Sequence, residues 1–148
     1  MKDKKNSNIV KIVKYAILLF IIYNMIWLLN VLVRYKPYTK GFETFEKNKS
    51  YYSVGKNGYV YNVKYPNYLS FTGNMAISKD NDRIGLIIWP KIFGNFDLGL
   101  QINEDNEIYS YILDAKRKDY NKSIIEKNRD DIEDLKKKAE NKFNIDLQ

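Results

Sequence analysis

The chain has 148 residues, with 25 lysines and arginines, 18 aspartates and glutamates, and neither cysteine nor histidine. This length suits one modest domain with appendages. Without cysteine the chain has no disulfide scaffold, thiolate nucleophile or cysteine-bound metal, and without histidine it lacks the commonest general base and metal ligand. These absences exclude serine–histidine, cysteine–histidine and zinc-hydrolase chemistry.

The positive charge of the chain is concentrated at its N-terminus. Residues 1–34 hold six basic and one acidic side chains, whereas residues 35–148 hold 19 basic and 17 acidic ones. A nucleic-acid-binding domain is expected to carry a basic face on its folded part. The nearly neutral remainder therefore argues against a nucleic-acid partner.

An uncharged stretch at residues 15–33 follows the basic residues 1–14 and ends at Arg34. Its nineteen residues would form a helix of roughly 29 Å, which matches the hydrocarbon thickness of a bilayer. No small-residue cleavage motif follows, so we expect a retained transmembrane anchor instead of a cleaved signal peptide. The lysine excess before the span modestly favours a cytoplasmic N-terminus and an extracellular C-terminal domain in a single-pass membrane protein.

One face of the predicted anchor carries larger polar and aromatic side chains. Tyr23, Trp27, Asn30 and Arg34 recur at helical spacing, and Asn24 lies beside them. This face suits contact with a second transmembrane helix, in which an amide would add hydrogen bonds. The alternative is that Asn30 and Arg34 simply lie at the membrane interface.

Residues 34–49 contain Pro37 and Gly41 with little periodicity, which predicts a juxtamembrane linker. Residues 50–148 then alternate between apolar and polar side chains, which is typical of half-buried strands. Asn57-Gly58 predicts a tight hairpin turn, and the other connections are short enough to require antiparallel neighbours. The predicted strands are Tyr51–Val54, Tyr59–Tyr65, Leu69–Ser78, Ile84–Trp89, Phe96–Ile102 and Glu107–Leu113.

The apolar spacing changes to a helical one over residues 122–143. Asn121 or Ser123 is a suitable cap for its start. An apolar stripe predicts that this helix covers one face of the sheet, and it consists of Ile125, Ile132, Leu135, Ala139 and Phe143. The expected fold is α+β: an N-terminal transmembrane helix, then a mostly antiparallel sheet of five to six strands packed by one C-terminal helix.

The remaining candidates for chemistry are carboxylates in two turns. Asp80 and Asp82 lie in one turn, and Glu104, Asp105 and Glu107 lie in another. Asp-x-Asp is one start of a calcium loop, but the glycine and the distal glutamate of the EF-hand are missing. Paired carboxylates also perform glycoside hydrolysis, yet both groups lie on turns without an evident pocket wall. We expect polar turns, no enzyme activity, no cofactor, no metal and no small-molecule substrate.

Aromatic side chains are the better indication of function, because tyrosine alone supplies 13 residues. Tyrosine and tryptophan are frequent at the energetic centres of protein interfaces. The alternative is that these rings complete the core or stack across strands. The candidate partner-binding residues are Trp89, Asp97, Gln101, Glu104, Tyr109 and Tyr111.

The segments YPNYLSFTGNMAIS and GLIIWPKIFGNFDLGLQI, within residues 65–102, resemble small membrane-anchored proteins of Gram-positive bacteria. The plan of anchor, sheet and helix is similar to that of the TipC-type immunity proteins. The resemblance covers about 50 residues and includes no catalytic signature. It implies an extracytoplasmic domain, held at the membrane, that binds and blocks a secreted antibacterial toxin.

Two functions follow as expectations. The first is a membrane-anchored extracytoplasmic domain that binds a protein partner such as a secreted toxin, with the lipid bilayer contacted through residues 15–33. The alternative is an accessory subunit of a cell-envelope or secretion complex, in which Tyr23, Trp27 and Asn30 would contact another membrane helix.

Overall fold

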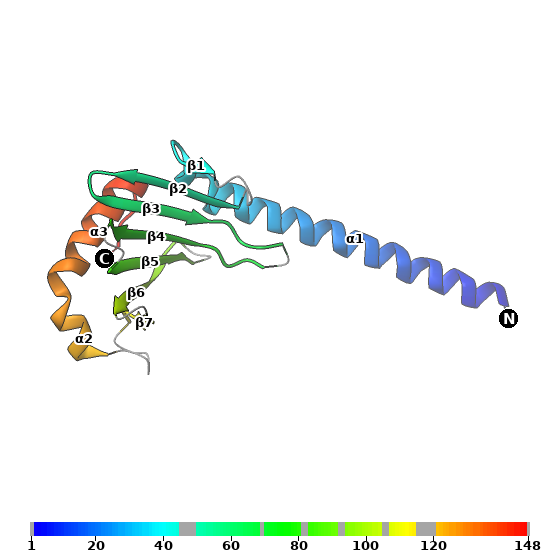
Figure 1. The fold of residues 1–148 in the computed structure, drawn as a ribbon. Coiled ribbons are helices and arrows are strands. Elements are labelled where there is room, and N and C mark those ends of the chain that lie inside the picture. The colour runs from blue at the N-terminus through cyan, green and yellow to red at the C-terminus, as the bar shows by residue number, and fades with distance from the viewer. Residues whose placement is uncertain are drawn as a thin grey trace.

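The computed structural model describes residues 2–44, 50–68, 70–80, 83–91, 94–104, 107–114 and 121–147. A long N-terminal helix, α1 (Lys2–Arg34), is followed by a short 3-10 helix, η1 (Lys36–Thr39). An antiparallel sheet and two C-terminal helices complete the chain (Figure 1). The α+β fold with an antiparallel sheet confirms the sequence prediction.

The sheet is a meander in which each strand pairs with its sequence neighbours, in the order β1-β2-β3-β4-β5-β6-β7. All six predicted strands form, and a two-residue strand at the edge joins them. The strands are β1 (Glu43–Thr44), β2 (Tyr51–Lys56), β3 (Tyr59–Lys64), β4 (Asn74–Lys79), β5 (Ile84–Pro90), β6 (Phe96–Glu104) and β7 (Glu107–Ile112).

The turn between β2 and β3 forms where Asn-Gly predicted it. Asn57 and Gly58 have φ angles of 54° and 79°, so both central residues have the positive φ that a tight hairpin turn of this type requires. The prediction of a strand over residues 69–78 is wrong at its start, because β4 begins at Asn74. Residues 70–73 belong instead to a loop that contacts α1, for a tertiary reason given below.

The C-terminal segment forms two helices where the sequence predicted one. They are α2 (Lys122–Lys127) and α3 (Arg129–Phe143). The break is at Asn128, whose φ and ψ of −109° and 19° are not helical. The predicted cap is confirmed, because Asn121 Oδ1 accepts a hydrogen bond from the Ile124 backbone N–H at 3.2 Å.

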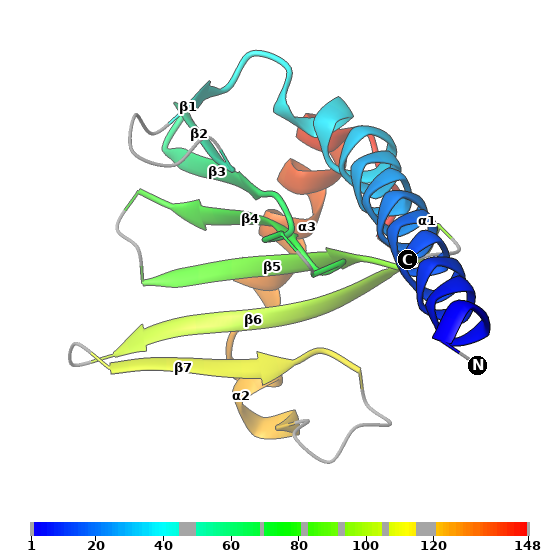
Figure 2. The ribbon, with the colours of Figure 1, turned by 90° about the vertical axis from the view of Figure 1, so that its right-hand side faces the viewer.

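The core lies between the sheet and α3, as the alternation of the strands and the stripe of the helix predicted (Figure 2). Ile132, Leu135, Ala139 and Phe143 of the stripe are buried, and Ile125 packs beside them. The sheet contributes the apolar side chains of one face, which are Tyr61, Val63, Met75, Ile77, Ile84, Leu86, Ile88, Leu100 and Ile102.

Residues 34–44 pack closely against the domain, although the sequence predicted an irregular linker there. Tyr35 is only 1% exposed, and its hydroxyl accepts a hydrogen bond from the Gly73 backbone N–H at 2.9 Å. Tyr38 and Phe42 contact the ring of Phe143, with centroid distances of 6.0 and 6.2 Å. These contacts bind the end of α1 firmly to the domain.

One part of α1, Asn8–Arg34, is 27 residues long and is apolar enough to cross a membrane. The helix continues without a break through the predicted tail and anchor. It runs away from the domain on the side of the sheet opposite to α2 and α3 (Figures 1 and 2). The uncovered face of the sheet is therefore turned toward the same side as the N-terminal end of α1.

Candidate functional site: the uncovered face of the sheet

The face of the sheet opposite α3 carries small and uncharged side chains. Successive side chains of a strand point to opposite faces, so the buried Leu86 and Leu100 assign their neighbours to this uncovered face. The register aligns Ser53, Asn62, Ala76, Ile87, Gly99 and Ile112 in one row across six strands. Among the described strand residues from β3 to β7, only Lys64 and Asp97 bring charge to this face.

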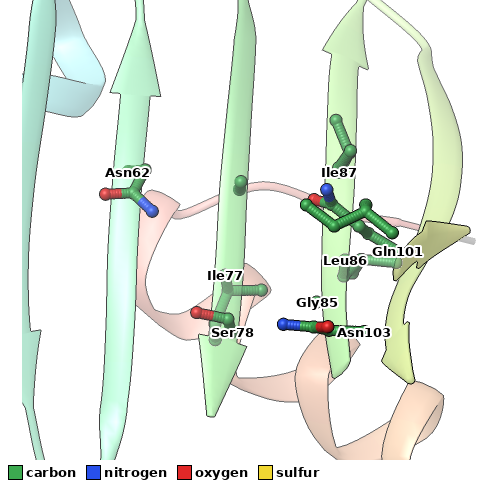
Figure 3. Close-up of a pocket in the computed structure, with 10 residues that line it drawn as sticks. Asn62, Ile77, Ser78, Gly85, Leu86, Ile87, Gln101 and Asn103 are labelled. Carbon is green, nitrogen blue, oxygen red and sulfur yellow. The ribbon is translucent and has the colours of Figure 1, made fainter. Parts of the chain in front are cut away.

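A shallow hollow of about 270 Å³ lies near the centre of this face (Figure 3). Its depth results from small residues on the central strands, where Ala76, Ser78 and Gly85 leave the sheet thinly covered. Its rim is formed by longer side chains from the neighbouring strands. These are Asn62, Ile87, Gln101, Asn103 and Ile108.

Three amide side chains give the hollow its polar character. Asn62, Gln101 and Asn103 each offer both a donor and an acceptor. The Oδ1 atom of Asn62 is buried and has no hydrogen-bond partner among the described residues. A buried acceptor without a partner costs stability, so a ligand that donates a hydrogen bond there would recover that cost.

A second hollow of about 210 Å³ is lined by Trp89, Asp97, Ile112 and Asp114, of which the three strand residues lie on the same face. The Trp89 indole lies over Gly99, since a Cβ at residue 99 would come within 2.7 Å of the ring. Lys91 Nζ forms an ion pair with Asp97 Oδ1 at 2.6 Å at this end of the face. The uncovered face therefore combines an aromatic surface, amides and small residues, which is a composition suited to a polypeptide partner.

The outer edge of β7 continues this surface. The strand is the last of the sheet, and no described strand pairs with its outer side. Ile108 is 64% exposed and Tyr109 is 42% exposed. An exposed strand edge with apolar side chains offers backbone N–H and C=O groups to an added strand.

The structure divides the six predicted partner-binding residues between two faces. Trp89, Asp97 and Gln101 share the uncovered face, as their register shows. Tyr109 pairs with Ile102 and Tyr111 pairs with Leu100, so both tyrosines are on the face of the core. Glu104 has the same parity and lies exposed at the end of the β6–β7 hairpin.

Tyr111 packs against the core, and the Tyr109 hydroxyl donates a 2.5 Å hydrogen bond to Glu107 Oε2. This hydrogen bond raises the pKa of Tyr109, because loss of the phenolic proton would break it. Interface contact by these three residues stays a prediction. They do not form one surface with Trp89 and Gln101.

The polar and aromatic face of α1 contacts a loop of the same chain. Trp27 Nε1 donates to the Asn67 carbonyl at 3.1 Å, and Asn30 Nδ2 donates to the Phe71 carbonyl at 3.3 Å. The Tyr68 hydroxyl donates to Asn24 Oδ1 at 2.8 Å, and Tyr23 packs edge-to-face on Phe71 at 5.5 Å. Contact with a second membrane helix stays a prediction, but these groups already have partners in the β3–β4 loop, whose described residues are 65–68 and 70–73.

The turn carboxylates are placed in two separate hairpin ends. Asp80 is exposed, while Glu104 and Glu107 are cross-strand partners at the other turn. Asp82 and Asp105 lie outside the described residues. Across the described ranges, no three histidine, cysteine or acidic side chains are grouped to hold a metal ion.

Of the residues that line the hollow, sequence reasoning predicted only Gln101 and missed the others, among them Asn62, Ala76, Ser78 and Ile108. The alternation that identified the core also assigned Asn62 to the opposite face, so its side could have been found. Strand pairing was needed to align it with the small residues of β4 and β5. A comparison with protein-family models, curated proteins and solved structures finds no match to this chain.

Proposed function

We propose that this chain is a single-pass, membrane-anchored domain that binds a protein partner outside the cytoplasm. Its most concrete form is an immunity protein that binds and neutralises a secreted antibacterial toxin. The observation that carries the proposal is the uncovered, nearly uncharged sheet face that continues onto the outer edge of β7, with which no described strand pairs. A face of this kind offers shape, amides and strand-pairing groups to another polypeptide, and we propose no catalytic role.

The position of α1 supports a partner that acts at the membrane. The apolar stretch Asn8–Arg34 is long enough to anchor the domain, and the uncovered face is turned toward its N-terminal end (Figure 1). A bound partner would therefore lie between the domain and the bilayer. Such a location suits interception of a toxin that approaches the membrane of the protected cell.

The alternative of an envelope-complex subunit has lost part of its support. It relied on Tyr23, Trp27 and Asn30 as a free face of the anchor, and all three contact the β3–β4 loop. Replacement of α1 by an unrelated span would still test it. Full protection by such a chimera would leave the anchor with a tethering role only.

The first experiment establishes the side of the membrane. Since the chain has no native cysteine, Asn103→Cys creates a single exposed thiol at the end of β6. We expect a membrane-impermeant maleimide to label intact cells. Labelling only after lysis, in folded protein, would place the domain in the cytoplasm and contradict the proposal.

The second experiment locates the binding face. A photo-crosslinking amino acid at Gln101 or Ile108 should form one discrete adduct with the toxin when the cells are grown together with sibling cells that secrete it. Ile108→Lys should abolish both the adduct and survival in co-culture, because it places a charge on the apolar edge. Lys137→Glu, on the exposed side of α3, is the matched control and should keep both. Adducts from residue 137 alone would move the binding site to the helical face.

A further inference from the structure

The β3–β4 loop makes an unusual set of contacts for a surface connection. Two of its backbone carbonyls accept hydrogen bonds from Trp27 and Asn30 of α1. In addition, the Gly73 backbone N–H donates to the hydroxyl of Tyr35, a buried residue that directly follows α1. A Cβ at Gly73 would lie 2.3 Å from the Lys64 carbonyl oxygen and 2.8 Å from Tyr35 Cε1. Only glycine fits this close approach, which brings the loop against Tyr35 immediately before β4 begins at Asn74.

The loop reaches far along α1. Its contacts extend from Tyr35, just beyond the helix end, to Tyr23. Eleven residues separate Arg34 from Tyr23, which corresponds to roughly 16 Å along the helix axis. The loop therefore lies beside the same part of the helix that the apolar stretch occupies (Figure 1).

The other faces of this helical segment are apolar and uncovered. Exposed fractions of 40–59% are found for Met25, Ile26, Leu28, Leu29 and Leu32. If water began at Tyr23, the helix from Ile9 to Ile22, which includes Lys11 and Lys14, would measure only roughly 21 Å, short of the roughly 30 Å hydrocarbon core. The bilayer must therefore surround α1 beyond Tyr23, at the level where the loop lies.

The composition of the loop suits that environment. No lysine, arginine, aspartate or glutamate occurs between Lys64 and Lys79, and Tyr68 is 53% exposed. The turns at the opposite end of the sheet are charged, with Asp80 in one and Glu104 and Glu107 in another (Figure 2). Tyrosine and tryptophan are enriched where protein crosses from hydrocarbon to headgroups, and Trp27, with Tyr68 packed edge-to-face on it at 5.5 Å, lies closer to that boundary than Tyr23 does.

Several polar groups of the loop have hydrogen-bond partners within the protein. Non-helical backbone is tolerated at membrane depth only when its N–H and C=O groups have protein partners. The carbonyls of Asn67 and Phe71 accept from α1, the Ser70 N–H donates to the Asn67 carbonyl, and the Thr72 N–H donates to Ser70 Oγ. The side chains of Trp27 and Asn30 thus take the place of water at two carbonyls of the loop.

We propose that the β3–β4 loop is a second membrane contact, inserted beside α1 into the leaflet on the domain's side with Tyr68 facing lipid. This inference rests on the membrane anchoring proposed above. It gives the domain a fixed orientation on the bilayer, because one helix alone would leave the domain free to rotate and tilt. The polar face of α1 then serves to hold the loop at lipid depth.

The test uses spin labels on the full chain in phosphatidylcholine–phosphatidylglycerol vesicles. Single cysteines replace either Tyr68 or Asn67. The Asn67 side chain is exposed and its backbone carbonyl makes the contact with Trp27, so this substitution keeps both that contact and Tyr68. Leu19→Cys is the reference for hydrocarbon, and Lys137→Cys on α3 is the reference for water. Collision rates of each label with oxygen and with a water-soluble nickel chelate are then compared.

We expect labels at residues 67 and 68 to favour oxygen over the nickel chelate, as the label at residue 19 does, and the label at residue 137 to show the reverse. Nickel accessibility at residues 67 and 68 equal to that at residue 137 would overturn the loop insertion while leaving the anchor in place. Nickel accessibility at residue 19 would overturn the anchoring itself, and the loop insertion with it.

Discussion

The two faces of the sheet are built from the same strands but differ in burial and in side-chain composition. On β5, Leu86 is fully buried against α3, whereas its neighbour Ile87 is half-buried on the uncovered face. The covered face is continuous aliphatic and aromatic core, and the uncovered one alternates amides with glycine, alanine and serine. Burial is thus concentrated on one side of the sheet, and the other side is the one that we propose for recognition.

The largest difference between the faces should appear on truncation of these two neighbours. Leu86→Ala should lower the free energy of unfolding by about 2–5 kcal/mol, because it creates a cavity in the core. Ile87→Ala should cost less than half as much, since its side chain is only half-buried. Chemical denaturation of the full chain in detergent micelles measures both. Equal losses would show that the uncovered face is also a stability element.

A methyl group at Gly99 should disturb the uncovered face without touching the core. Its Cβ would come within 2.7 Å of the Trp89 ring, so overpacking should cost about 1–3 kcal/mol and displace the indole. Gly85→Ala is the matched control, because its nearest contact is an ordinary 3.4 Å to the Ile77 carbonyl. With Trp27→Phe as background, the emission maximum of Trp89 should shift only in the Gly99 variant. An unchanged spectrum would argue against the packing of Trp89 on Gly99.

Removal of the buried amide of Asn62 should be neutral or stabilising. Asn62→Val deletes an acceptor that has no partner among the described residues and adds a strand-favouring side chain, for a gain of about 1 kcal/mol. Asn103→Val, at the exposed end of the same face, should change the free energy of unfolding little. A loss of stability in the Asn62 variant would mean that the amide stabilises the sheet, which would argue against an unpaired acceptor available to a ligand.

The smallest expected effect is a pH dependence of stability that arises from two hydrogen bonds on the covered side of the sheet. The hydrogen bond from Lys79 to Asp131 at 2.5 Å raises the pKa of Lys79, and that from Tyr59 to Asp134 at 2.6 Å raises the pKa of Tyr59. Both folded-state pKa values exceed their ordinary values of 10.5 and 10.0. The contribution to stability is therefore complete below those ordinary values and is lost as pH rises through the folded-state ones.

Unfolding midpoints measured from about pH 8 to about pH 11 should fall at the alkaline end. The combined variant Tyr59→Phe and Lys79→Gln should fall less steeply, because it removes both titrating groups. Tyr109→Phe removes another phenol whose pKa is raised by a hydrogen bond to a carboxylate, and comparison with it separates the covered side of the sheet from the exposed hairpin end. Identical slopes in the combined variant and the unsubstituted chain would assign the alkaline loss to other groups.

Local patterns in the sequence predicted most of the elements. Asn57-Gly58 predicted its turn because both residues tolerate positive φ, and the alternation of Leu98, Leu100 and Ile102 predicted their shared face. The predicted strand over residues 69–78 was too long, because its apolar start is held by α1. The sequence also failed to predict the helix break at Asn128. That residue is buried and its side chain donates to the Ile124 carbonyl, and neither feature can be read from the spacing of apolar residues.

The sequence by itself determined the period of each element, the uncharged helix and the division of each strand into two faces, because these depend on residues two to four positions apart. Only the tertiary structure decided what each face meets. Trp27 and Asn30 bind partners 40 and 41 residues away. Asn62 lines the hollow because strand pairing aligns it with Ala76 of β4. Such contacts depend on how the elements pack, and local periodicity carries no information about a partner so distant along the chain.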